Sequence, residues 1–210
     1  MTTRIGINGF GRMGRLALRA GWRQPGLEFV RINETACDAA SAAHLLQFDS
    51  VHGAWATPCG AADGQLRVDE RTIAYSGNSA IAATDWSDCD IVIEATGRHH
   101  KSPQSLQDYL AQGVRKVLVA APTEGALNIV YGVNHQAYDP ARDHVVTAAS
   151  CTTNCLAPIV KVMHEQVGIV HGCMTTIHAL TNTQTIVDKG HHDLRRARAC
   201  GQSLIPTTTG

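Results

Sequence analysis

The stretch Gly9-Phe10-Gly11-Arg12-Met13-Gly14 decides how the rest of the chain is interpreted. It matches the pattern G-x-G-x-x-G, follows a strand-like run at residues 4–8 and opens a helix-like run at residues 11–23. In such a turn the first glycine permits a tight bend, the second lets a pyrophosphate approach the backbone, and the third lets the helix pack closely. The free amides and dipole of the helix N-terminus favour phosphate. The six residues therefore predict a dinucleotide-binding turn.

An acidic residue at the end of the second expected strand indicates which dinucleotide is bound. Glu34 lies 20 residues after Gly14 and follows shortly after the run at residues 27–32. A carboxylate there accepts hydrogen bonds from ribose hydroxyls and repels a 2′-phosphate, which favours NAD over NADP. Thr96 and Gly97 close another expected strand and are predicted to lie along the same cofactor crevice. The alternatives are a solvated loop for Glu34 and an ordinary strand-to-loop turn for the other pair.

The first 149 residues alternate apolar strands with amphipathic helices. This alternation predicts a parallel sheet covered on both faces, with weakly alternating residues 51–79 as an antiparallel insertion. Further strands are expected at residues 90–94, 115–119, 128–133 and 145–147, and further helices at residues 38–48 and 105–112. A second unit begins near Ser150, with a helix at residues 152–167 and a long strand at residues 168–178. The fold class is thus α/β: a Rossmann-type doubly wound parallel sheet in residues 1–149, followed by the start of a second α+β catalytic domain in residues 150–210.

Charge and composition exclude several classes of function. The chain has 18 basic and 18 acidic side chains, which gives no electrostatic reason to bind nucleic acid or an anionic membrane. Apolar runs fall well short of the ~20 residues that span a bilayer, and the N-terminus lacks a signal-like apolar core, so a cytoplasmic location is expected. Seven scattered cysteines without a CxxC pair predict neither a disulfide framework nor a metal site.

One cysteine stands where a thiol is easily activated. Cys151 begins the helix that follows the strand at residues 145–147, and helix N-termini lower a thiol's pKa. Cys155, one turn deeper, is expected to be buried and unreactive. The base that such a nucleophile needs is supplied by the fold, and His178, at the end of the expected strand, is the best candidate. Taken singly, each could instead be a structural cysteine or a surface histidine.

Four motifs together resemble one enzyme family, the phosphorylating glyceraldehyde-3-phosphate dehydrogenases. They occur in the family's order along all 210 residues and are Asn8-Gly9-Phe10-Gly11-Arg12-Met13-Gly14-Arg15, Ser150-Cys151-Thr152-Thr153-Asn154-Cys155-Leu156-Ala157-Pro158, Thr175-Thr176-Ile177-His178-Ala179 and Pro206-Thr207-Thr208-Thr209-Gly210. The resemblance implies that Cys151 forms a hemithioacetal and then a thioester with the aldehyde, and that His178 accepts the proton. Hydride would pass to NAD, and phosphate or an analogue would release the acyl group.

The resemblance also implies the partners of the protein. These are a small phosphorylated aldehyde, inorganic phosphate or arsenate, and identical subunits in a homotetramer of the full-length form. Residues at positions expected to bind substrate or anion are Ser150, Thr152, Thr181, Thr183, Thr209 and Gly210.

The chain departs from the family pattern in several places. Family members continue beyond the equivalent of Gly210, so we expect a partial gene product with an exposed apolar face and no dehydrogenase activity by itself. The threonine-rich stretch at residues 180–185 is altered, and the loop at residues 187–195 lacks the usual proline. Because of that loop and of Thr35, which stands where the family usually has an apolar residue, NADP is excluded less firmly than Glu34 alone would suggest. Together with an extra arginine in residues 195–198, these changes resemble a subgroup associated with arsenic resistance, whose product is 1-arseno-3-phosphoglycerate.

Two other functions stay open at this point. One is a dehydrogenase of a related phosphorylated aldehyde such as erythrose 4-phosphate, which Thr181 and Thr183 would suit equally. The other is an inactive, truncated nucleotide-binding remnant. Physical reasoning does not separate arsenate from phosphate, because both are tetrahedral anions recognised by the same donors.

Overall fold

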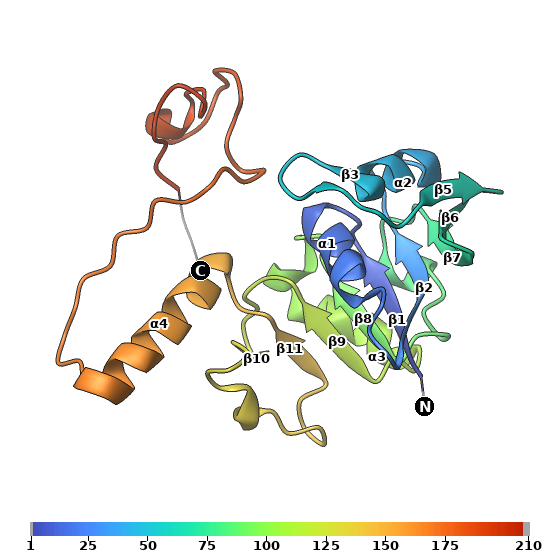
Figure 1. Ribbon diagram of the computed structural model, residues 1–210, viewed down its shortest axis with the longest axis horizontal. Coiled ribbons are helices and arrows are strands. Elements are labelled where there is room, and N and C mark those ends of the chain that lie inside the picture. The colour runs from blue at the N-terminus through green and yellow to red at the C-terminus, as the bar shows by residue number, and fades with distance from the viewer. Residues whose placement is uncertain (1, 208–210) are drawn as a thin grey trace. The chain divides into compact units, whose positions relative to one another are not determined.

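A largely parallel sheet organises the first 149 residues of the computed structural model, which describes residues 2–207 (Figure 1). In this described part the strands lie in the order β10-β11-β9-β8-β1-β2-β7-β6-β5. Every pair from β10 to β7 is parallel, and β7, β6 and β5 are joined by antiparallel pairs. The strand bounds are β1 Thr3–Asn8, β2 Leu27–Asn33, β5 Cys59–Ala62, β6 Gln65–Val68, β7 Arg71–Ser76, β8 Ile91–Glu94, β9 Lys116–Val119, β10 Leu127–Asn128 and β11 Val145–Thr147.

Helices cover both faces of this sheet, as the alternating sequence predicts. Side chains alternate between the two faces of a strand, and on β8 Ile93 packs in one apolar cluster while Val92 packs in another. The first cluster includes Leu18 of α1 (Arg12–Gly21) and Leu46 of α2 (Ala39–Gln47). The second includes Tyr109 of α3 (Gln107–Ala111) and side chains of the short 3-10 helices η1 (Ile81–Ala83) and η3 (Pro103–Leu106). The doubly wound α/β prediction is therefore confirmed.

The expected antiparallel insertion is present, but one expected strand was too long and one expected helix is divided in two. Residues 51–79 contain β4 (Gly53–Ala54), which pairs with β3 (Phe48–Asp49), and the antiparallel strands β5 to β7. The strand expected at residues 128–133 is reduced to β10, because the chain turns after Ile129 and then forms the short helix η4 (His135–Ala137). The helix expected at residues 105–112 is divided between η3 and α3, and η2 (His99–Lys101) precedes them.

The described residues from 150 to 207 belong to a second compact unit. Its described part contains α4 (Cys151–Val167) and the short η5 (Leu194–Arg196), but no strand. The long strand predicted at residues 168–178 is therefore wrong for this structure. A strand needs a partner for its backbone hydrogen bonds, and residues 150–207 provide none. The side chains of Ile159, Val162 and Val167 on α4 are consequently exposed.

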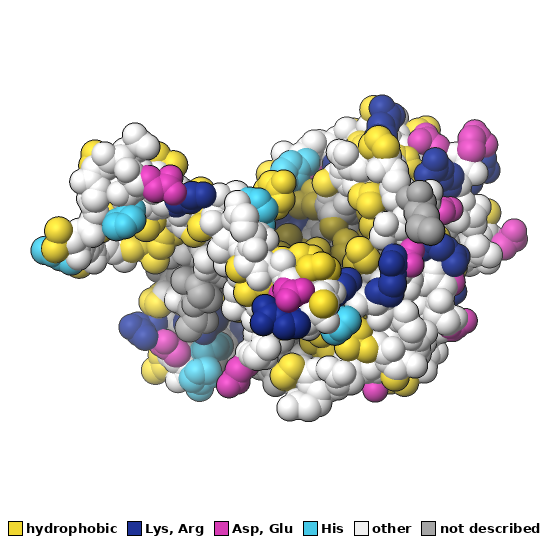
Figure 2. Space-filling view, turned by 90° about the horizontal axis from the view of Figure 1, so that it is seen from below, with side chains coloured by type: hydrophobic (Ala, Val, Ile, Leu, Met, Phe, Trp, Pro, Cys, Tyr) yellow, Lys and Arg dark blue, Asp and Glu magenta, His cyan; other side chains and the backbone are white. Residues whose placement is uncertain are grey.

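The surface carries charges of both signs. Lysine and arginine side chains are interspersed with aspartate and glutamate on the face shown in Figure 2, in keeping with the zero formal net charge. Among the described residues, no helix has the length and apolar character needed to cross a membrane.

Candidate functional site

The glycine turn between β1 and α1 has the geometry that its sequence predicts. Gly9 has a φ of +88°, and a Cβ there would lie 2.5 Å from the backbone nitrogen of Thr96. A Cβ on Gly14 would lie 2.3 Å from the carbonyl oxygen of Gly9, so only glycine lets α1 pack this closely. By contrast, a Cβ on Gly11 would meet nothing within 4 Å. The turn is thus closed beneath Gly9 and Gly14 and open above Gly11, where a pyrophosphate could approach the backbone.

Glu34 follows β2 directly and its carboxylate reaches the glycine turn. One oxygen accepts a hydrogen bond of 2.7 Å from the backbone N–H of Phe10, and the other accepts one of 2.8 Å from Ala36. Each carboxylate oxygen has a further lone pair. The side chain is half-buried, so it is held beside the turn and can still accept hydrogen bonds from a ribose.

The remaining residues predicted for the nucleotide site differ in what they expose. The side chain of Phe10 is 1% exposed and belongs to the core, so only its backbone can face a ligand. Met13 is 57% exposed. Arg12 forms an ion pair of 2.9 Å with Asp49 of β3. Its guanidinium is therefore already paired with a carboxylate.

Thr96 and Gly97 follow β8 at the same sheet edge as the glycine turn. The hydroxyl of Thr96 donates a 2.5 Å hydrogen bond to Glu94 and accepts one of 3.1 Å from the backbone N–H of Arg98. Gly97 has a φ of +70°, and a Cβ there would meet nothing within 4 Å. The two residues therefore form an open turn next to Gly9.

Cys151 is the first residue of α4, and its neighbour Ser150 caps that helix. The Ser150 hydroxyl accepts a 3.0 Å hydrogen bond from the backbone N–H of Thr153, which is the usual role of serine at this position. The Asn154 side chain donates 2.9 Å to the Ser150 carbonyl. Thr152 is 7% exposed. The thiol of Cys151 is thereby placed at a well-defined helix N-terminus.

His178 is brought to Cys151 across 27 residues of sequence. Its Nε2 lies 3.0 Å from the Cys151 Sγ, and its Nδ1 lies 2.6 Å from the carbonyl oxygen of Ala179. A carbonyl oxygen can only accept, so Nδ1 carries a proton and Nε2 faces the thiol. The imidazole is thus oriented to take the thiol proton.

The two partners shift each other's ionisation toward the charged forms. Partial burial alone would raise the pKa of Cys151, but the hydrogen bond and charge of His178, with hydrogen bonds to Thr152, lower it below its ordinary value. The hydrogen bond to Ala179, followed by the hydrogen bond and charge of Cys151, raises the pKa of His178. The geometry and both shifts favour a thiolate beside an imidazolium, the reactive form of cysteine.

Two threonines expected to bind substrate phosphate also lie together. The hydroxyl oxygens of Thr181 and Thr183 are 3.1 Å apart and exposed. The side-chain oxygen of Gln184 accepts hydrogen bonds from the N–H and the hydroxyl of Thr181. Thr209 and Gly210, predicted for the same role, lie outside the described residues.

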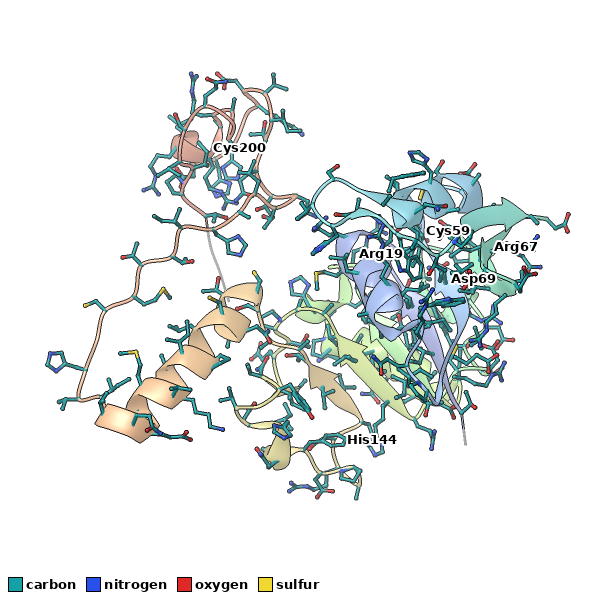
Figure 3. The ribbon with its side chains drawn as sticks, viewed as in Figure 1. Arg19, Cys59, Arg67, Asp69, His144 and Cys200 are labelled. Atoms are coloured by element: carbon teal, nitrogen blue, oxygen red, sulfur yellow. The ribbon has the colours of Figure 1, made fainter. Side chains whose placement is uncertain are left out.

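The other cysteines differ from Cys151 in their surroundings. Cys59 on β5 and Cys200, in the segment after η5, are labelled in Figure 3. Burial raises the pKa of Cys59 to about 11, and burial raises that of Cys89 further. Cys155 is exposed, so the expectation that it is buried was wrong. Helix α4 would have to pack against another layer to cover it, and residues 150–207 do not form one.

Comparison with known proteins identifies the family. The model described as "Glyceraldehyde 3-phosphate dehydrogenase, NAD binding domain" matches residues 3–102, and the model of the same enzyme's C-terminal domain matches residues 150–210. The chain belongs to the glyceraldehyde-3-phosphate dehydrogenase family. Its first part is accordingly an NAD-binding domain, and the open space above Gly11, with Glu34 beside the turn, fits that cofactor.

Curated glyceraldehyde-3-phosphate dehydrogenases match the whole chain. It is 56% identical over 213 residues to glyceraldehyde-3-phosphate dehydrogenase 3 of Nostoc sp., 45% over 220 residues to the enzyme of Geobacillus stearothermophilus, and 46% over 214 residues to that of Streptomyces coelicolor. Each match covers 100% of this chain and 63% of the relative. The chain therefore spans just under two thirds of the length of these relatives.

Sequence reasoning missed several residues that hold the site in place. They include Ala179, whose carbonyl orients His178, and Asp49, which binds Arg12. It also missed Asn8, which hydrogen-bonds with Asn33 across the sheet. A signal was available for the last pair, because each asparagine is the final residue of a strand and directly precedes a predicted site residue.

Proposed function

We propose that the protein oxidises glyceraldehyde 3-phosphate with NAD, with Cys151 as nucleophile and His178 as base. The observation that carries the proposal is the 3.0 Å contact between the Cys151 Sγ and the His178 Nε2 at the N-terminus of α4. Residues 1–149 would hold NAD, and residues 150–210 would contribute the reacting groups. The full set of motifs, in family order, supports the assignment.

In the proposed reaction the Cys151 thiolate adds to the aldehyde carbon, and the His178 imidazolium gives its proton to the aldehyde oxygen, which forms a hemithioacetal and leaves His178 neutral. His178 then takes the hydroxyl proton while the C–H bond breaks, which leaves a thioester on Cys151. When bound, NAD accepts the hydride of that step. An oxygen of inorganic phosphate attacks the thioester carbon, the C–S bond breaks, and 1,3-bisphosphoglycerate and the thiolate are released. The lowered pKa of Cys151 favours the attacking thiolate, and the raised pKa of His178 favours the imidazolium that donates the first proton.

The substrate phosphate and the acyl acceptor would be held by hydroxyls and helix-terminal amides. We propose that the adjacent hydroxyls of Thr181 and Thr183 bind an anion. Ser150 and Thr152 at the start of α4, together with Thr209 and Gly210, would bind substrate or anion as well. Arsenate would replace phosphate without a change of geometry, giving 1-arseno-3-phosphoglycerate. The homotetramer and the cytoplasmic location stay predictions.

NADH formation tests the proposal. It should be measured for the chain by itself and for the product of any continuous reading frame that contains it, with glyceraldehyde 3-phosphate and either phosphate or arsenate. Erythrose 4-phosphate as the better aldehyde would favour the related dehydrogenase. Cys151→Ser should abolish turnover, whereas Cys155→Ser, a matched thiol one helical turn away, should retain it. Equal turnover in the two variants would refute the assignment of Cys151.

A further inference from the structure

A row of polar side chains, three of them buried and one half-buried, crosses the sheet next to the glycine turn. Asn8 of β1 is in register with Glu94 of β8 on one side and with Asn33 of β2 on the other, and Asn33 is in register with Ser76 of β7. We name these four residues the polar row. Central parallel strands are usually apolar on both faces, and burying polar groups is unfavourable unless they are hydrogen-bonded. Their presence at the end of four neighbouring strands therefore needs a reason.

Glu94 is the acidic member of the row and is 2% exposed. Its carboxylate accepts hydrogen bonds from Asn8 Nδ2 at 3.2 Å and from the Tyr109 hydroxyl at 2.6 Å. It also accepts from the Thr96 N–H at 2.9 Å and the Thr96 hydroxyl at 2.5 Å. All four groups have a hydrogen to donate, which matches a carboxylate. Burial, followed by the nearby Glu94, raises the pKa of Tyr109, so its hydroxyl keeps the proton that it donates.

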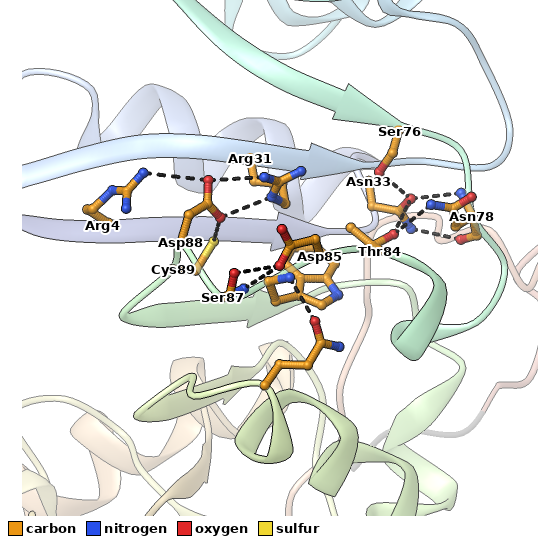
Figure 4. Close-up of polar contacts among 12 residues, drawn as sticks. Arg4, Arg31, Asn33, Ser76, Asn78, Thr84, Asp85, Ser87, Asp88 and Cys89 are labelled. Atoms are coloured by element: carbon orange, nitrogen blue, oxygen red, sulfur yellow. Dashed lines mark hydrogen bonds and ion pairs between the residues drawn. The ribbon is translucent and has the colours of Figure 1, made fainter.

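Hydrogen bonds continue from Glu94 along the row to β7. Asn8 Oδ1 accepts 2.8 Å from Asn33 Nδ2. Asn33 Oδ1 in turn accepts from the Ser76 hydroxyl and the Asn78 N–H, each at 2.8 Å (Figure 4). A chain of bonds oriented in one direction polarises its members cooperatively. The ends of β8, β1, β2 and β7 are thus fixed relative to one another.

This network meets the nucleotide turn through the backbone. The Ala95 N–H donates 2.7 Å to the Asn8 carbonyl, and the Gly9 N–H donates 2.8 Å to the Asn33 carbonyl. The backbone of Thr96 lies so near Gly9 that a Cβ on the glycine would be 2.5 Å from its nitrogen. Any movement of the loop that Glu94 holds would therefore displace Gly9.

We propose that Glu94 is a positioning residue for NAD, which acts by fixing Thr96 and Asn8 so that the glycine turn keeps its binding shape. The inference concerns residues outside the proposed chemistry and rests only on NAD binding by the first part of the chain. It separates Glu94 from Glu34, whose carboxylate borders the cofactor site directly.

NAD titration by calorimetry of the full chain, with melting temperatures for each variant, tests this role. Glu94→Gln keeps the volume but replaces one carboxylate oxygen, which accepts two hydrogen bonds, with an NH2 group that can only donate. It should raise the NAD dissociation constant about tenfold or more. Tyr109→Phe removes one donor and should raise it less. Asp88→Asn is the matched control: it also removes a carboxylate charge, but one that binds Arg31 and Arg4 before β8 begins, so affinity should stay within about twofold.

A double variant provides rescue. Asn8→Asp with Glu94→Gln exchanges carboxylate and amide within one contact and should recover part of the affinity. A folded Glu94→Gln chain that binds NAD as tightly as the wild type would overturn the inference, as would equal weakening by Asp88→Asn. If Glu94→Gln does not fold, Tyr109→Phe decides, and unchanged affinity in that variant overturns the proposal. Absence of NAD binding by the wild-type chain would refute the cofactor assignment as well.

Discussion

Two alanine substitutions in the glycine turn should separate cofactor binding from folding. Gly11→Ala places a methyl group in open space, since a Cβ there meets nothing within 4 Å. Gly14→Ala places the same methyl group 2.3 Å from the Gly9 carbonyl oxygen and 3.0 Å from the Ile7 side chain. The first should impair NAD binding without harming the fold, and the second should harm the fold itself.

The expected magnitudes follow from these contacts. At Gly11, alanine reduces the conformational freedom of the unfolded chain, which stabilises the folded protein by about 0.4–1 kcal/mol. Alanine is also a poorer helix N-cap than glycine, which offsets this gain by a similar amount. The free energy of unfolding should therefore barely change. At Gly14, alanine in a helix gains about 0.5–1 kcal/mol, but overpacking costs about 1–3 kcal/mol. The difference is a net loss of up to about 2.5 kcal/mol for Gly14→Ala, and the upper part of this range is expected because the methyl group meets a backbone oxygen that cannot move aside cheaply. NAD affinity of Gly11→Ala should fall about tenfold or more, because the methyl group lies where the pyrophosphate approaches.

Urea unfolding followed by tryptophan fluorescence measures the stability of the relevant unit, because Trp22, Trp55 and Trp86 all lie in residues 1–149. Calorimetry with NAD measures the affinity. Unchanged NAD affinity for folded Gly11→Ala, or a stability loss equal to that of Gly14→Ala, would refute the interpretation of the turn.

Three further predictions concern reactivity and cofactor choice. Limiting iodoacetamide at neutral pH should label Cys151 first and Cys59 much more slowly, as peptide mapping would show, because the pKa of Cys151 is lowered and that of Cys59 is raised to about 11; faster labelling of Cys59 would contradict this. A lowered pKa means that the Cys151 thiolate persists as pH falls, so His178→Asn should shift the pH profile of Cys151 labelling to higher pH, with little change in NAD affinity. An unshifted profile would show that His178 is merely structural. NAD should bind more tightly than NADP, and Glu34→Ala should narrow the difference between the two dissociation constants; tighter NADP binding by the wild type would count against Glu34 as the selecting residue.

Local sequence patterns were sufficient for most of the first unit. The glycine turn, β1, β2 and α1 follow from short-range preferences of strand, turn and helix, and the parallel sheet follows from their alternation. The pattern could not fix lengths, as β10 shows: residues 128–133 have a strand-like sequence, but β11 offers a partner only to Leu127 and Asn128. Pairing is a property of two segments, and one segment's sequence does not contain it.

The same limit explains the errors in residues 150–207. Helix α4 was predicted almost to the residue, because its hydrogen bonds are internal to one segment. The strand expected at residues 168–178 and the burial of Cys155 both require a neighbouring layer, which the described part of this unit does not form. A helix can be specified locally, whereas a strand and a buried face depend on what packs against them.

For the candidate site, the sequence by itself was enough to propose Cys151, His178 and Glu34 and to predict the conformation of the glycine turn. Only the tertiary structure decided that His178 Nε2 reaches the Cys151 Sγ, that the Ala179 carbonyl orients the imidazole, and that Glu94 holds the loop beneath Gly9. The physical reason is the separation along the sequence over which each kind of interaction acts. Backbone conformation and helix capping act over a few residues, while the contacts that shift a pKa or fix a loop join groups 27 or 86 residues apart, as in Cys151–His178 and Asn8–Glu94.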